Sequence, residues 1–286
     1  MPAVMNKTGS RTVGFCDQFV TINFYGEELE GLVDFLCCDL QTGPESAARA
    51  RYDVMLGGSI NQMLSLWLGE QCQYSGECRY ELAYTLINEI IYQCIVDNAA
   101  GHAIHAAAIG SANGAVLLPG KSGFGKSTLT AWLVSKGGNY LTDELVLLSG
   151  KKKQLLPFTR PFSMKAGSSA ILNSFVQYKQ KDTISGVGGF MLPHRLLNPD
   201  FFPLTPALSL ILFPEYREGA ATELNQLSSA LGCAKLMECY VNARNIEGLG
   251  IDQLADYTRN TPVFQLVYGS FDGLYEQLHE SFPLLF

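Results

Sequence analysis

One glycine-rich segment restricts the fold of this chain more than any other feature of the sequence. Residues 120–127 read Gly-Lys-Ser-Gly-Phe-Gly-Lys-Ser and match the pattern G-x-x-x-x-G-K-[ST]. The apolar run 115–118 before it is typical of a buried strand, and residues 128–134 after it are typical of the start of an amphipathic helix. Such a strand, turn and helix N-terminus direct backbone N–H groups and the helix dipole at one place, which favours an anion. We therefore expect this segment, called the phosphate loop below, to bind a nucleoside triphosphate.

The residues of the phosphate loop have separate expected roles. Lys126 would bridge the β- and γ-phosphates, and the Ser127 hydroxyl would bind Mg²⁺. The residues predicted to contact the nucleotide are Gly120, Lys121, Ser122, Gly123, Phe124, Gly125, Lys126, Ser127 and Thr128.

An acidic pair follows the loop at a distance that returns it to the same site. Asp143 lies 17 residues (143 − 126) after Lys126, which corresponds to one helix, one turn and half of a returning parallel strand. Phosphoryl transfer needs Mg²⁺ held by a carboxylate, and a second carboxylate beside it can accept the proton of an incoming hydroxyl. Asp143 and Glu144 are therefore candidate metal ligands, and the alternative is a solvent-facing pair at a strand end.

His105 is a third candidate, and it precedes the loop. It lies within 102–108 among small apolar residues that would allow a ligand to approach closely. A lone histidine on an apolar strand is more often a core residue, so both a structural and a functional role stay open.

These three elements resemble the HPr kinase/phosphorylase group, which is related to phosphoenolpyruvate carboxykinase in its nucleotide site. The resemblance rests on His105, the phosphate loop with its lysine 21 residues later (126 − 105), and the acidic pair after it. It extends through 157–165, which is similar to a proline-arginine-proline…lysine segment of shorter HPr-kinase-related proteins, and through 210–216. It covers roughly residues 101–286 and points to the HPr-kinase-related kinase A branch, to which lasso-peptide tailoring kinases are similar.

The resemblance implies a mixed α/β fold and a reaction. The expected fold is an HPr kinase/phosphoenolpyruvate carboxykinase-like P-loop core with a smaller N-terminal α+β region. The expected reaction is transfer of the γ-phosphoryl of ATP, with Mg²⁺, to a serine-like hydroxyl of a peptide, a protein or a small molecule. Two alternatives stay open: a nucleotide-binding regulatory or scaffold protein without phosphotransfer, and a nucleoside triphosphate hydrolase.

The resemblance also implies roles for individual residues. Lys126 would bind phosphates, Ser127 with Glu144 or Asp143 would hold the metal, and Asp143 would be the general base. His105 would lie near the transferred phosphoryl group. Arg160 and Lys165 would stabilise charge on the acceptor side, although an ordinary pair of edge-strand cations is an equal alternative.

Composition and charge limit the partners. The chain has 286 residues and a formal net charge of −7, and its one dense basic run, 151–153, is expected at a solvated hairpin tip. Because nucleic-acid backbones need a basic face, we expect no nucleic-acid partner. No run approaches the roughly 18 apolar residues that span a bilayer, so no membrane partner is expected. Relatives in the resembled group often assemble, which makes a homo-oligomer one expectation.

The N-terminus and the cysteines suggest a compartment. Residues 1–10 lack the apolar core of a signal peptide. The eight cysteines form no C-x-x-C pair, so free thiols in a reducing cytoplasm are expected.

The pattern of apolar residues predicts two domains, an accessory region over 1–100 and a kinase domain over 101–286. Predicted strands cover 15–24, 102–109, 115–118, 140–148, 154–158, 207–213 and 263–268. Predicted helices cover 80–99, 128–136, 228–242, 251–259 and a last helix capped by Ser270 that reaches 278, whereas 29–40 and 59–68 are ambiguous. A hairpin turn of the Asn-Gly type is expected at 111–114, and long loops at 186–189 and 193–206.

Overall fold

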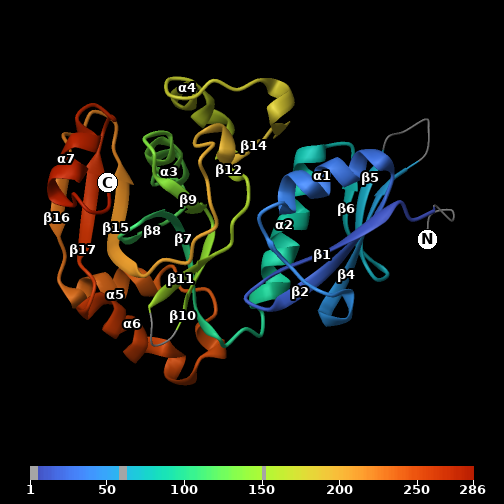
Figure 1. Cartoon of the computed structure of the whole chain (residues 1–286), viewed down its shortest axis with the longest axis horizontal. Helices are drawn as coiled ribbons and strands as arrows, with labels where there is room; N and C mark the ends of the chain where they lie inside the picture. Colours follow the sequence, from blue (N-terminus) through green and yellow to red (C-terminus); the bar gives the residue numbers. More distant parts are fainter. Residues whose placement is uncertain (1–5, 58–62, 150–152) are drawn as a thin grey trace. The chain divides into compact units, whose positions relative to one another are not determined.

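The computed structural model describes residues 6–57, 63–149 and 153–286, which form two compact units (Figure 1). The first unit contains the chain up to Asn98 together with Ser163–Gly167 and Tyr178–Pro193. The second unit contains Ala99–Phe162, Ser168–Gln177 and His194–Phe286. Two short segments from the second half of the chain therefore belong to the first unit.

The first unit combines a six-stranded sheet, two helices and a small three-stranded sheet. The strand order in the larger sheet is β3-β1-β2-β4-β5-β6, and in the smaller one β12-β14-β13. The larger sheet consists of β1 (Gly9–Phe15), β2 (Gln18–Tyr25), β3 (Gln41–Thr42), β4 (Ala48–Leu56), β5 (Leu64–Leu68) and β6 (Gln71–Gly76). The smaller sheet consists of β12 (Phe162–Lys165), β13 (Ile184–Gly186) and β14 (Gly189–Leu192).

Both helices of this unit bury one apolar stripe. Helix α1 (Glu27–Cys37) resolves the ambiguity over 29–40 and buries Leu29, Leu32 and Leu36. Helix α2 (Arg79–Ile95) follows the predicted period and ends four residues before the predicted end at residue 99. Residues three and four apart share a helix face, so each stripe faces a single layer of the core.

Two predictions in this unit need correction, and one ambiguous segment is partly resolved. The strand predicted over 15–24 is the end of β1, a tight turn and β2, because Cys16 and Asp17 have positive φ values (51° and 61°) that suit a two-residue hairpin turn. Of the ambiguous segment 59–68, residues 64–68 form β5, while 59–62 lie outside the described residues. The loop predicted at 186–189 is a tight turn, since Gly186 pairs with Gly189 in the β13–β14 hairpin.

The second unit is built on an eight-stranded mixed sheet in the order β11-β10-β7-β8-β15-β17-β16, with β9 also paired to β7. Strand β8 runs parallel to β15, and β15 runs parallel to β17, whereas β7 is antiparallel to β8, β9 and β10. The strands are β7 (Gly101–Ser111), β8 (Gly114–Pro119), β9 (Asn139–Thr142), β10 (Leu145–Ser149), β11 (Gln154–Pro157), β15 (Leu208–Tyr216), β16 (Glu223–Gln226) and β17 (Val263–Tyr268).

Strand β7 is central because it is long and has partners on both edges. It pairs with β8 along one edge and with β9 and β10 along the other. Its small side chains Ala103, Ala106, Ala107 and Ala108 are fully buried. Strand β8 and the segment formed by β9 and β10 are therefore both held by β7, on its two opposite edges.

Among its described residues, this unit has five α-helices. They are α3 (Lys126–Ser135), α4 (Ser169–Leu172), α5 (Ser229–Met237), α6 (Ile251–Arg259) and α7 (Leu274–Ser281). Figure 1 shows α5 and α6 side by side below the sheet. The sheet and these helices make the fold a mixed α/β fold.

Four local predictions in this unit are wrong in detail. The strand predicted over 140–148 is broken into β9 and β10 at residues 143–144. Helix α5 ends at Met237, well before 242. The last helix starts at Leu274 after Gly273, and the Ser270 hydroxyl accepts a bond from the Asp272 N–H instead of capping the helix. In the β7–β8 hairpin Ser111 pairs with Gly114, so the Asn-Gly pair is not at the centre of the turn.

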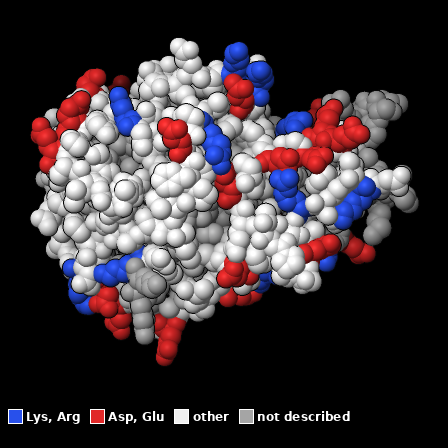
Figure 2. Space-filling model, viewed as in Figure 1, with Lys and Arg blue, Asp and Glu red and all other residues white. Residues whose placement is uncertain are grey.

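The surface charge, the cysteines and the helix lengths bear on which partners the protein has. On the face in Figure 2, acidic and basic side chains are interspersed, without a continuous basic patch among the described residues. The predicted hairpin tip at 151–153 lies outside the described residues except for Lys153. All eight cysteines lie in described parts and are free thiols. Among the helices of the described residues, none has the length and apolar character needed to cross a membrane.

Candidate functional site

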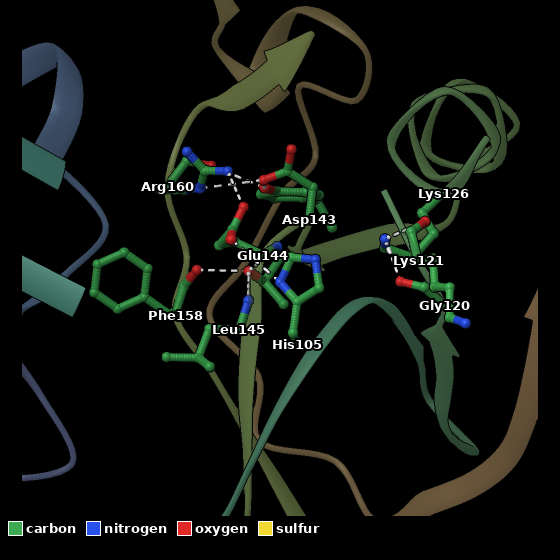
Figure 3. Close-up of polar contacts among 11 residues, drawn as sticks. His105, Gly120, Lys121, Lys126, Asp143, Glu144, Leu145, Phe158 and Arg160 are labelled. Carbon is green, nitrogen blue, oxygen red and sulfur yellow. Dashed lines mark hydrogen bonds and ion pairs between the residues drawn. The ribbon is translucent and has the colours of Figure 1, made fainter. Parts of the chain in front are cut away.

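The phosphate loop joins the end of β8 to the start of α3, as the sequence pattern predicts. Lys126 is buried, and its Nζ donates to the carbonyl oxygens of Gly120 (2.5 Å) and Lys121 (3.1 Å), as Figure 3 shows. The exposed ammonium of Lys121 pairs with Glu238 at 3.0 Å. The loop therefore wraps around the Lys126 ammonium, which is the group expected to meet a phosphate.

Two tyrosines anchor the end of the loop. The Tyr216 N–H donates to the Phe124 carbonyl oxygen (3.2 Å), and the Tyr268 hydroxyl donates to the Gly125 carbonyl oxygen (3.3 Å). Gly125 has φ of 85°, and a Cβ placed there would lie 2.5 Å from the Tyr268 hydroxyl. Only glycine combines this left-handed backbone with so close an approach.

Asp143 and Glu144, called the carboxylate pair below, lie in the break between β9 and β10. The buried Thr142 hydroxyl accepts bonds from the N–H groups of Glu144 (3.1 Å) and Leu145 (3.3 Å) and donates to the Phe158 carbonyl oxygen (2.7 Å). A hydroxyl that bonds nearby backbone groups stabilises a turn in place of a continuous ladder. Thr142 therefore fixes the position at which the carboxylate pair leaves the sheet.

The register of β7 brings the loop and the carboxylate pair to the same level of the sheet. On one edge, Ala106 pairs with Pro119, the last residue of β8. On the other edge, His105 pairs with Leu145 and Ala108 pairs with Thr142. Neighbouring strands lie about 4.8 Å apart, so about 10 Å separates the backbone of β8 from that of β9 and β10. The loop and the carboxylate pair therefore lie at opposite edges of the same stretch of β7.

Asp143 is completely buried in a polar cluster with Arg160 and Tyr140. Its Oδ1 lies 3.3 Å from Arg160 Nε and 3.2 Å from the Tyr140 hydroxyl, and the side chains of Asp143 and Arg160 are 0% and 2% exposed. The Tyr140 hydroxyl also lies 2.9 Å from the Arg160 carbonyl oxygen. Burial and the nearby Asp143 charge raise the pKa of Tyr140 well above its usual value, so this phenol is a neutral donor.

Glu144 forms the accessible half of the carboxylate pair. Its Oε2 lies 2.7 Å from Arg160 Nη2 and its Oε1 lies 3.2 Å from His105 Nδ1 (Figure 3). The side chains of Glu144 and His105 are 30% and 37% exposed. Burial by itself raises the pKa of Glu144, but the bond to His105 and the charges of Arg160, His105 and Lys126 lower it to about 2. Glu144 is therefore ionised at neutral pH.

The donor set suits a hard cation that is shared with phosphate oxygens. Ser127, half-buried in the first turn of α3, offers a hydroxyl, and Glu144 offers an ionised carboxylate. Mg²⁺ prefers oxygen ligands and is usually held by one or two carboxylates with phosphates and water, without an all-protein cage. The described residues contain no group of three or more His, Cys, Asp or Glu side chains that could hold a metal ion. The residues present therefore fit Mg²⁺ bound together with a nucleotide.

The structure gathers His105, Asp143, Glu144 and Arg160 into one contact network. Lys165, by contrast, is exposed at the end of β12 and belongs to the first unit. The roles assigned to all these residues stay predictions.

Sequence reasoning missed Tyr140 and Thr142. Both lie on the strand that leads into the carboxylate pair, and both carry a buried hydroxyl. Two hydroxyl-bearing residues on a buried strand directly before an acidic pair are the sequence signal that could have identified them.

Comparisons with known proteins add one structural likeness to these observations. No family model matches the chain, and neither does any curated protein. One solved structure to which the chain is similar is described as the HPr(Ser) kinase/phosphatase from Coxiella burnetii. The TM-score is 0.32 and the identity 14%, over 64% of this chain and 96% of that chain. A TM-score at this level establishes neither a shared fold nor a shared activity.

Proposed function

We propose that this protein is an ATP- and Mg²⁺-dependent kinase that transfers the γ-phosphoryl group to a serine-like hydroxyl. One observation carries the proposal: the phosphate loop and the carboxylate pair flank the same stretch of β7. Catalysis of phosphoryl transfer consists mainly of positioning and charge neutralisation, and in this proposal the loop would bind the phosphates on one side of β7 while a carboxylate on the other side would bind the metal.

Lys126 would bind the β- and γ-phosphates after exchanging its bonds to Gly120 and Lys121 for phosphate oxygens. Ser127 and Glu144 would hold Mg²⁺, which neutralises charge on the phosphates. We assign the metal to Glu144 and not to Asp143, because Glu144 is partly exposed whereas Asp143 is enclosed by Arg160 and Tyr140.

The proton of the acceptor hydroxyl needs an accessible base, and the general-base role predicted for Asp143 fits poorly with its complete burial. His105 is accessible, and because its Nδ1 lies 3.2 Å from Glu144 Oε1, its Nε2 is the ring nitrogen that would take up the proton. We therefore propose His105 as the group that receives the proton. Asp143 would instead hold Arg160 beside Glu144.

The acceptor is proposed only as a class, a hydroxyl of a peptide, protein or small molecule. The test incubates the protein with γ-labelled ATP, Mg²⁺ and serine-bearing acceptors, and follows label in the acceptor and free phosphate separately. Lys126→Ala should lower transfer by several orders of magnitude, because it removes the cation that meets the phosphates. Glu144→Gln should lower transfer and weaken its dependence on Mg²⁺.

Two matched substitutions control for general damage. Lys136→Ala changes an exposed lysine just past the other end of α3, and Glu223→Gln changes an exposed carboxylate on β16. Both should transfer at the wild-type rate. Near-wild-type transfer by Lys126→Ala would refute the proposal. ATP binding with no acceptor labelling and no phosphate release would favour a nucleotide sensor, and phosphate release alone a hydrolase.

A further inference from the structure

Aromatic rings form a continuous row beside the phosphate loop. Tyr216, Tyr268, Phe271 and Trp132 contact one another in that order, with centroid distances of 5.6, 5.9 and 4.5 Å. Tyr268 and Trp132 are buried, whereas Tyr216 is 49% exposed. The row therefore ends at one ring that presents an uncovered surface to solvent.

This row is attached to the phosphate loop directly before Lys126. The Tyr216 N–H donates to Phe124, and the Tyr268 hydroxyl donates to Gly125. A Cβ added to Gly125 would lie 3.0 Å from the Cβ of Tyr216. Tyr216 is thus held against the loop by backbone contact and by a buried ring behind it, which gives an exposed aromatic a fixed position.

The sheet topology determines which end of a bound nucleotide faces this ring. Strand β8, which leads into the loop, has β7 and then the carboxylate pair on one side, and β15 and β17 on the other. Tyr216 and Tyr268 are the last residues of β15 and β17, which run parallel to β8. Ligands of α/β sheets bind beyond the carboxyl ends of parallel strands. With the terminal phosphate directed at the carboxylate pair, the base points toward β15 and β17.

We propose that the base of a purine nucleoside triphosphate stacks on the exposed ring of Tyr216 and so extends the aromatic row. This inference rests on the proposed function, because it takes the phosphate loop as the phosphate site. A purine presents a larger stacking face than a pyrimidine, and base–aromatic stacking needs only a free ring face in a fixed position.

The contribution of the base to affinity can be distinguished from that of the phosphates with two ligands, ATP and inorganic tripolyphosphate. Each is titrated with Mg²⁺ into the full chain, and calorimetry measures the Kd. Tyr216→Ala should raise the Kd for ATP about tenfold and leave the Kd for tripolyphosphate unchanged. Tyr216→Leu, which keeps a large apolar side chain without a ring, should behave like Tyr216→Ala. Tyr216→Phe should bind both ligands like the wild type.

Tyr92→Ala is the matched control, since Tyr92 is an exposed tyrosine on α2 and should change neither affinity. Unchanged ATP affinity in Tyr216→Ala and Tyr216→Leu would overturn the inference. An equal loss for ATP and tripolyphosphate would overturn it too, because it would mean that Tyr216 only supports the loop. Failure of the proposed function would give a different result from these two outcomes. Tripolyphosphate would then not bind the wild type, or it would bind the Lys126→Ala variant as tightly as the wild type.

Discussion

His105 and Glu144 meet across neighbouring strands, with Nδ1 of the histidine 3.2 Å from Oε1 of the glutamate. The contact is specified by the register, since His105 pairs with Leu145, the residue after Glu144. It joins two partly exposed side chains at the edge of a buried Arg160–Asp143 pair. A ligand on the phosphate loop would meet this histidine and glutamate before the buried residues behind them.

The His105→Asn substitution distinguishes a catalytic role of His105 from a purely structural one. If His105 receives the proton of the acceptor, turnover should fall about 100-fold, a typical effect of losing a general base. The measurement is initial-rate kinetics with γ-labelled ATP and an acceptor that the wild type labels. His279→Asn on α7 is the control and should keep the wild-type rate. A His105→Asn protein that is less stable but transfers at the wild-type rate when folded would assign His105 a structural role only.

The buried Arg160 guanidinium should contribute strongly to stability. Arg160→Met leaves Asp143 as a buried carboxylate without its cation, and breaking such a pair costs about 3–5 kcal/mol. Urea unfolding at neutral pH measures the change. Arg217→Met removes an exposed arginine that pairs with Glu215 and should cost at most about 1 kcal/mol. Equal effects of the two substitutions would contradict the buried pairing.

Glu144 should make stability depend on acid pH in a defined window. Its pKa is lowered from the usual 4.5 to about 2 in the folded protein, because its cationic neighbours outweigh its burial. A carboxylate with a depressed folded-state pKa stabilises the fold above its unfolded-state pKa, and this contribution is lost as the pH falls through the folded-state value. The difference in unfolding free energy between wild type and Glu144→Gln should therefore shrink from pH 4.5 toward pH 2. A difference that stays constant or grows over this range would show that Glu144 is not stabilised as an anion.

Gly125→Ala tests the close approach of the loop to Tyr268. The substitution adds a Cβ 2.5 Å from the Tyr268 hydroxyl at a φ of 85°, and should cost about 2 kcal/mol or more. Gly219→Ala is a matched control, since Gly219 also has a positive φ (71°) but no atom near an added Cβ, so it carries only the backbone strain. Thermal unfolding of both variants measures the difference. Equal losses would mean that the contact with Tyr268 adds nothing.

The sequence predicts those features of the site that depend on local pattern. An apolar run, a glycine-rich turn and a helix start in residues 115–134 form a strand, a loop and α3, because each of these is specified by neighbouring residues. The sequence also points to His105 and the acidic pair by their spacing, and to Arg160 through the family resemblance, and these residues meet in the structure.

Features that depend on long-range pairing could not be predicted in the same way. The break at Asp143–Glu144 exists because Thr142 bonds to the chain near Phe158, and the burial of Asp143 depends on Arg160, 17 residues later (160 − 143). Residues 163–165 of the short strand β12, which pairs with β14, belong to the first unit, although Phe162 at the start of the same strand belongs to the second. Neither contact leaves a periodic signal in its own segment.

A crystal structure of the full chain with a non-hydrolysable ATP analogue and Mn²⁺ in place of Mg²⁺ tests the central claim most directly. Anomalous scattering locates the manganese ion independently of the nucleotide density. The account predicts the triphosphate along the loop with its β- and γ-oxygens at Lys126, and the manganese ion coordinated by Ser127 and Glu144. Phosphates bound away from the loop, or a metal ion that does not contact Glu144, would contradict it.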